Sequence, residues 1–559
     1  MRFMWDEPFR TLVVHFFKRF FDTDTASEDS VPRTRLIQLL ALSAVVTFLL
    51  MVLLIRGIAS AQFGAIDEIG MRISIHFTFV CYAMLVIGLV MTFKWDALFP
   101  DRRDYLILAP LPISAKRLFT AKLIALCGFL LLFLVATNLF LLVPVVFMDT
   151  GAVLGHIVGV LGGSAFAALF FAGLQGVLIN LLTPRAFRRV SPSVQMVAIT
   201  LLIALLLILP ILNAAVRLLI LIDSPLLDYF PPVWFLGVYE SLSFSPSAVP
   251  KAGLWTAIAF KAFGIAGMTA VLSYVVGYRR HARRVMESFE SGDVPPSWWA
   301  ALSRRVLNSW LLMNPAQRAA FYFIGKISDR SAKHRISVAL YSGFGLALVL
   351  SSLFAFDRRE AFPFVLSKSG VLEASAVLSF LLLAGWRATF NVPYELPANW
   401  VFQMADRASA LEFRKAIRKW VFACRIVPLY ALIAFFEFAW FDVATAVSHL
   451  VFDLIATAFL TEAFFFGFRK VPFTCAFLKS KLQLVFYAVA YLCAYTTYTT
   501  LAGEMKGWVA AEPVHLLRFL GGSAMLFGLL LIYRALARAE TSKIIYEEPD
   551  PSFQQLNLS

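Results

Sequence analysis

A series of apolar runs extends along the chain, each close to the roughly 20 residues that a helix needs to cross a bilayer. Twelve such runs occur, at residues 36–55, 73–93, 123–147, 157–182, 196–221, 254–277, 336–355, 370–386, 421–441, 444–467, 482–502 and 514–533. The composition agrees, because 60% of the 559 residues are hydrophobic and 15% are charged, whereas soluble proteins average roughly 45–50% and about 25%. The sequence therefore predicts an all-α polytopic membrane protein with about twelve transmembrane helices.

The placement of Lys and Arg predicts the orientation of these spans. If the N-terminus is cytoplasmic, the inner segments hold 40 of the 50 basic residues and the outer segments hold the other ten. Basic residues near span ends are retained in the cytoplasm. We therefore expect both termini in the cytoplasm of a multi-pass plasma-membrane protein. The net charge of +15 then reflects this bias rather than binding to nucleic acid.

The spans also divide into two sets of six with similar spacing. Each set opens with a basic, aromatic segment of amphipathic pattern, at residues 3–21 and 307–326, and each has a substantial cytoplasmic segment between its second and third spans. Such a pattern predicts two copies of one six-helix unit. The expected organisation is a first membrane unit at 1–277, a basic linker at 278–306, a second unit at 307–536 and a cytoplasmic tail at 537–559.

Motifs for nucleotide hydrolysis and common catalytic centres are missing from the sequence. The nearest match to a phosphate-binding loop is FIGKIS, around Gly325 and Lys326, which lacks the upstream glycine and the hydroxyl after the lysine. HExxH and GxSxG do not occur, and the five cysteines show no metal-ligand spacing. We therefore predict that the chain is not an enzyme and holds no metal or cofactor of its own.

Residues 99–119, FPDRRDYLILAPLPISAKRLF, form the most unusual cytoplasmic segment. A charged cluster, an apolar run, two prolines and a serine follow one another in it: Asp101, Arg102, Arg103, Asp104, Leu106, Leu108, Pro110, Leu111, Pro112 and Ser114. Proline interrupts a helix and serine caps one, so we expect a short helix near the membrane plane, a rigid corner and then the third span. The alternative is an interfacial loop whose charges contact lipid headgroups.

This segment resembles the ABC-2 type transporter permeases, the membrane-spanning subunits of bacterial ABC exporters. The matching features are the cluster Asp101–Asp104, LAPLPIS at Leu108–Ser114 and LFTAKL at Leu118–Leu123. The family's usual Glu-Arg pair is replaced by Asp101-Arg102, and its Gly-Thr is absent. The resemblance implies that a soluble ATPase, as a dimer that binds ATP and Mg, docks on this coupling segment in a bacterial inner membrane.

Two more regions fit the resemblance. The outer loop at 223–250 is aromatic and rich in proline, where such permeases often have a re-entrant hairpin; an aromatic membrane anchor is the alternative. The second-half counterpart of the coupling segment is WRATFNVPYELPANWVFQMADR, whose candidate contact residues are Pro393, Glu395, Pro397, Asn399 and Trp400.

Charged residues inside the predicted spans suggest that an ion gradient, rather than ATP, could drive transport. Asp453 and Glu462 lie deep in the tenth span, where a central charge costs roughly 2.5–3.5 kcal/mol. They could line a polar path, pair with Arg518 of the twelfth span, or simply help pack the bundle. Glu437 falls near an outer span end, where its side chain can reach the surface, and we expect it to have a structural role.

The alternative function is therefore an ion-coupled secondary transporter with twelve spans, in which Asp453 and Glu462 carry the coupling ion. A lipid-modifying membrane enzyme, a third class, has no catalytic constellation in this sequence.

Overall fold

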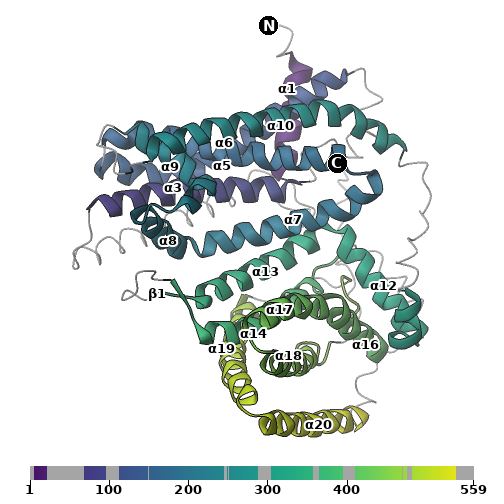
Figure 1. The fold of residues 1–559 in the computed structure, drawn as a ribbon. Coiled ribbons are helices and arrows are strands. Elements are labelled where there is room, and N and C mark those ends of the chain that lie inside the picture. Colours follow the sequence, from purple (N-terminus) through teal and green to yellow (C-terminus); the bar gives the residue numbers. More distant parts are fainter. Residues whose placement is uncertain are drawn as a thin grey trace. The chain divides into compact units, whose positions relative to one another are not determined.

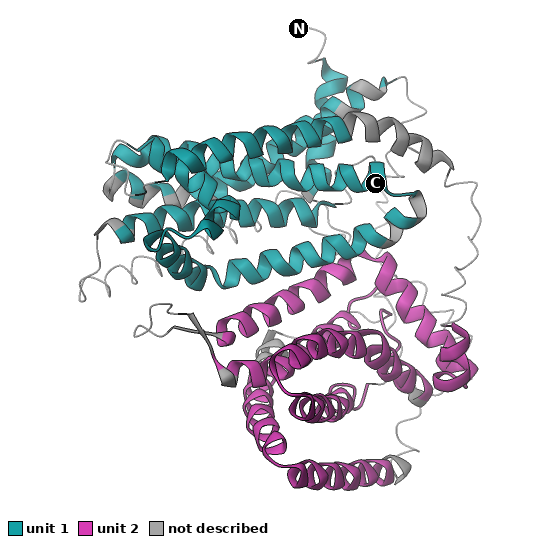
Figure 2. Cartoon of the chain, viewed as in Figure 1, with its two compact units in different colours: residues 1–293 teal, residues 294–559 magenta. Residues whose placement is uncertain are grey.

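The computed structural model describes residues 6–21, 68–95, 113–148, 150–243, 249, 251–287, 304–356, 364–394, 410–468, 470–474 and 481–536. The chain forms two compact units, residues 1–293 and 294–559 (Figure 2). The division falls within residues 278–306, which the sequence predicts to be a linker.

The first unit is helical. Its elements are α1 (Glu7–Phe21), α3 (Glu68–Phe93), α5 (Ala115–Met148), η3 (Thr150–Ala152), α6 (Val153–Leu181), α7 (Pro184–Leu207), α8 (Leu209–Leu221), η4 (Pro225–Tyr229), α9 (Pro231–Ser241) and α10 (Ala252–Glu287). Helix α3 packs against α5, α6, α7, α8 and α9, and α3, α5, α6 and α10 run alongside one another in Figure 1. Because most of α3 is buried, it forms the centre of this unit.

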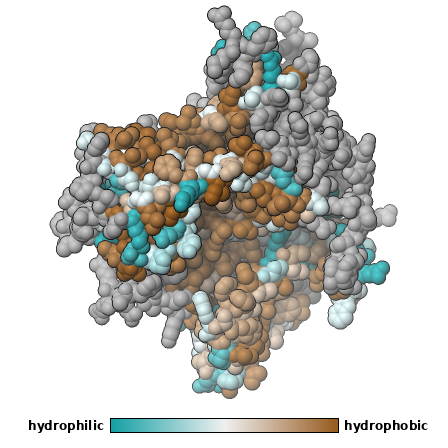
Figure 3. Space-filling view, turned by 45° about the horizontal axis from the view of Figure 1, so that its top comes forward, coloured by the Kyte–Doolittle hydropathy of each residue, from teal (hydrophilic) through white to brown (hydrophobic). Residues whose placement is uncertain are grey.

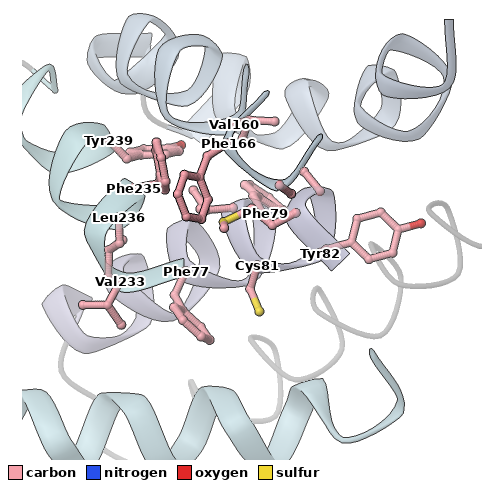
Figure 4. Close-up of a cluster of buried hydrophobic side chains, with 14 of the residues drawn as sticks. Phe77, Phe79, Cys81, Tyr82, Val160, Phe166, Val233, Phe235, Leu236 and Tyr239 are labelled. Atoms are coloured by element: carbon pink, nitrogen blue, oxygen red, sulfur yellow. The ribbon is translucent and has the colours of Figure 1, made fainter. Parts of the chain in front are cut away.

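Helix α9, within the predicted outer loop, is buried against α3, α6 and α10. Phe235, Leu236 and Tyr239 of α9 point into a core that also contains Phe79 of α3 and Phe166 of α6 (Figure 4). This loop is therefore a packed element among the residues that the structure describes, rather than only a surface anchor.

Glycines allow α9 to approach its neighbours this closely. A Cβ atom added to Gly155 of α6 would lie 2.3 Å from the carbonyl oxygen of Tyr239, and one added to Gly237 would lie 2.7 Å from Cβ of Trp255. A side chain at either position would collide with the neighbouring helix, so this close approach requires glycine.

The second unit contains η5 (Leu307–Leu311), α12 (Pro315–Arg330), α13 (Ala332–Leu353), α14 (Lys368–Thr389), α16 (Ala410–Val421), η7 (Phe422–Ile426), α17 (Val427–Trp440), α18 (Val443–Phe464), α19 (Lys481–Ala511) and α20 (Pro513–Leu536). Helix α14 contacts α13, α17, α18 and α19. A short antiparallel pair, β1 (Phe354–Phe356) and β2 (Phe364–Leu366), lies between α13 and α14. This hairpin is a small exception to the all-α prediction.

Local sequence explains two features of the third and fourth spans of this unit. Helices α16 and α17 are joined by the π-helical turn η7, which ends two residues before Pro428. The ring and the missing N–H of this proline disturb the regular pattern of hydrogen bonds. Asp442 lies between α17 and α18, where it accepts a hydrogen bond from the backbone N–H of Thr445 (3.1 Å) and caps α18. Hydrogen bonds from Thr445 also hold the pKa of Asp442 below its usual value.

Nine helices within the described residues are long and apolar enough to cross a membrane. They correspond to nine of the twelve predicted spans, and of the other three, 36–55 lies outside the described residues while 123–147 and 482–502 fall within α5 and α19. Large apolar side chains such as Leu181, Phe260 and Phe435 are well exposed, and apolar residues cover much of the described surface in Figure 3. Such an apolar surface is expected of helices that face lipid.

We predict that Gly155→Ala lowers the melting temperature of the purified protein, because the added methyl group meets the backbone of α9. Overpacking of this kind costs about 1–3 kcal/mol of unfolding free energy. Gly264→Ala is the matched control, since nothing lies within 4 Å of a Cβ atom there. Equal melting temperatures for the two variants would mean that α9 is not seated against α6.

Candidate functional site

Most of the predicted coupling segment lies outside the described residues. This applies to Asp101, Arg102, Arg103, Asp104, Leu106, Leu108, Pro110, Leu111 and Pro112, and in the second half to Glu395, Pro397, Asn399 and Trp400. Ser114 is described, and its Oγ accepts a hydrogen bond from the backbone N–H of Arg117 (3.4 Å) at the start of α5. The predicted cap is therefore present. Pro393 follows the end of α14.

In the first unit, the amphipathic helix α1 packs on the start of α5, which includes the last residues of the predicted coupling segment. Its apolar face, with Phe9, Phe16 and Phe20, is buried against a patch of α5 that contains Ala121 and Phe129. Asp6, just before α1, forms an ion pair with Arg117 of α5 (3.2 Å). We call this contact the first junction.

The second unit has a corresponding contact between α12 and α16, which we call the second junction. Glu412 of α16 accepts hydrogen bonds from the side-chain amides of Asn314 and Gln317. Lys419 Nζ donates to the Gln317 side chain and to the carbonyl of Leu311, each at 2.6 Å. In both units, an amphipathic helix is thus attached to the helix that follows the segment between the second and third spans.

A cluster of buried ionisable groups lies inside the second unit, where α14, α17, α18 and α19 meet. Lys506 of α19 is at its centre, with Nζ 2.9 Å from Glu437 Oε1, 3.0 Å from Asp453 Oδ2 and 3.3 Å from Ser375 Oγ. Nδ1 of His449 lies 2.9 Å from Glu437 Oε2. All four ionisable side chains are at most 5% exposed. We call Glu437, His449, Asp453 and Lys506 the buried cluster.

Each helix brings its residue to the cluster through ordinary helical periodicity. On α19, Thr499, Ala502, Lys506 and Val509 are all buried at the spacing of one helix face. Asp453 lies ten residues into α18, about 15 Å from its start. This depth is close to the middle of a hydrocarbon core that is about 30 Å thick.

The structure separates the residues that the sequence grouped into a polar path. Asp453 pairs with Lys506, Glu462 instead forms an ion pair with Arg418 of α16, and Arg518 is exposed. The interpretation of Glu437 as a surface-reaching residue is wrong, because it is buried between Lys506 and His449. Hydropathy alone does not indicate Lys506, because the apolar run of the eleventh span ends at residue 502, whereas the buried face of α19 continues to Val509.

The first unit has a smaller buried pair. Nδ1 of His76 on α3 lies 2.6 Å from Glu240 Oε1 on α9, and the His76 ring stacks on Tyr239 at 4.0 Å. This pair joins α9 to the central helix of its unit. Within the described residues, no group of three or more His, Cys, Asp and Glu side chains is arranged to hold a metal ion.

No protein-family model matches this chain, and neither a curated protein nor a solved structure matches it. The class of protein therefore comes from the fold: the long apolar helices make this chain a multi-pass α-helical membrane protein.

We predict that Lys506→Met strongly destabilises the second unit, because it leaves two buried carboxylates without their cation. Loss of one partner from a buried ion pair costs about 3–5 kcal/mol, which a thermal unfolding assay in detergent will detect as a lower melting temperature. Arg518→Met, at an exposed position, should change little. Combining Lys506→Met with Glu437→Gln and Asp453→Asn should restore part of the loss, and no recovery would contradict an electrostatic origin.

Proposed function

We propose that this chain is the permease subunit of an ATP-driven ABC exporter. A separate ATPase dimer, which binds ATP and Mg, would dock on the segment at 99–119 and, in the second half, on the segment that contains Pro393, Glu395, Pro397, Asn399 and Trp400. The main support for this proposal is the repeated junction, in which an amphipathic helix packs against the start of the third span in each unit.

The junctions are placed where they could transmit movement of the coupling segments to the third spans. A force applied to a segment between the second and third spans acts on the residues that open the third span, and these are the residues that α1 and α12 hold. The first junction is mainly apolar, whereas the second uses Glu412 and Lys419 in a set of polar contacts. A near-rigid helix pair can transmit a displacement into the membrane part of its unit.

We expect wild-type protein, extracted from its native membrane, to retain a soluble ATPase with a phosphate-binding loop, and Asp101→Ala/Arg102→Ala to lose it. The measurement is affinity capture followed by mass spectrometry. Arg188→Ala/Arg189→Ala, in the basic turn between the fourth and fifth spans, is a control for nonspecific loss of charge. Retention of the ATPase by the Asp101→Ala/Arg102→Ala variant would contradict the assignment of the docking site.

Ion-coupled secondary transport is a second candidate function, and the buried cluster favours it. Ionisable groups inside a membrane domain commonly mark proton or ion pathways. Here they would be Glu437, His449, Asp453 and Lys506 rather than the pair Asp453 and Glu462.

The two candidates differ in their response to a protonophore. If the chain is an ABC permease, compounds that appear in the medium only when the chain is expressed will continue to appear after the proton gradient is collapsed, provided that cellular ATP is maintained. Untargeted mass spectrometry of the medium, with ATP measured in parallel, tests this. Immediate loss of export at constant ATP would favour ion coupling.

A further inference from the structure

The buried cluster is a chain of contacts in which each member touches the next. It runs from His449 to Glu437, from Glu437 to Lys506 and from Lys506 to Asp453, at 2.9, 2.9 and 3.0 Å. Its order is imidazole, carboxylate, ammonium, carboxylate. If the imidazole carries a proton, charges of opposite sign alternate along the whole chain.

The charges of the four groups sum to zero only when a proton is added to the ordinary ionised set. Two carboxylates and one ammonium leave a net charge of −1 with a neutral imidazole. A net charge that is buried and away from water is costly, whereas a neutral, fully paired set is much less so. One bound proton therefore removes the excess charge.

Within the cluster, His449 is the group best placed to hold this proton. Imidazole is more basic than a carboxylate, and Nδ1 of His449 is directed at Glu437 Oε2. Lys506 already supplies a cation to both carboxylates. The edge contact between the His449 ring and Phe441, at 5.1 Å, helps to fix the ring on this side of α18.

Among the side chains that the structure describes, no other titratable group on the surrounding helices completes the charge balance. On α17 and α19, Tyr430 and Tyr498 lie near Asp453 and are neutral as phenols. Glu373 of α14 lies against Gly503 of α19 and interacts electrostatically with Tyr495. On α20, His515 stacks on Trp508, and Arg518 is exposed.

We propose that the buried cluster is a proton-binding site, which holds one proton on His449 and is electrically neutral when that proton is bound. The inference does not depend on whether ATP or an ion gradient drives transport. Proton uptake at this site would strengthen the His449 link between α18 and α17, and proton release would leave the cluster with an unbalanced negative charge.

The test is nuclear magnetic resonance of the full-length protein labelled with ¹⁵N in its histidine rings, reconstituted in lipid near pH 7. The chain has seven histidines, and the resonances absent from His449→Gln identify His449. In the wild type, both ring nitrogens of His449 should show the imidazolium signature. A neutral His449 in the wild type would overturn the proposal.

Substitutions within the cluster test whether the net charge of the whole cluster, rather than the contact with Glu437 alone, keeps the proton on His449. Glu437→Gln and Asp453→Asn each make the cluster neutral without the proton, so the imidazolium signature should be lost in both, although Asp453 has no direct contact with His449 in the chain of contacts described above. Lys506→Met should keep it. Glu462→Gln removes a carboxylate from the same helix outside the cluster and is the control, with no change expected.

Retention of the imidazolium signature in Asp453→Asn would also overturn the proposal. Each variant is compared only as a monodisperse sample, and the wild-type spectrum decides the question if a variant does not fold. None of these readouts involves an ATPase, so failure here and failure of the proposed function are distinguishable.

Discussion

A charge carried into the apolar part of a membrane must find its partner on a neighbouring helix, and this constraint organises the second unit. Lys506 satisfies it by contacting Glu437 of α17, Asp453 of α18 and Ser375 of α14 from its position on α19. Packing between lipid-facing helices gains little from the hydrophobic effect, so polar contacts of this kind specify which helix faces meet. The first unit achieves the same end with glycine contacts and the pair His76–Glu240.

The two junctions place a second constraint on both units. Each fixes an amphipathic helix to the start of the third span, through apolar packing at α1 and α5 and through polar contacts at α12 and α16. The chemistry of the two contacts differs while their position in each unit is the same. This position, next to the segments between the second and third spans, is the reason that the exporter proposal assigns the driving force to those segments.

The sequence predicted best those structural features that depend on neighbouring residues along the chain. Hydropathy located nine spans that coincide with apolar helices of the described residues, and Ser114 could be assigned as a cap from its neighbours alone. The partners of intramembrane charges could not be predicted, because they depend on which helix faces meet. Asp453 was expected near Glu462 or Arg518 but contacts Lys506, a residue on a helix that extends beyond its most apolar stretch. Similarly, nothing local in the outer loop predicted that α9 would be buried among three helices.

The exporter proposal requires that an ATPase binds the segment at 99–119. The most direct measurement is site-specific photocrosslinking in the native membrane, with a photoreactive amino acid in place of Leu106 and, as the control, in place of Leu226 in the predicted outer loop. If the exporter proposal is right, we expect a crosslink from position 106 to a soluble ATPase and none from position 226. Crosslinks from position 106 to lipid alone, in a membrane where that ATPase is present, would contradict it.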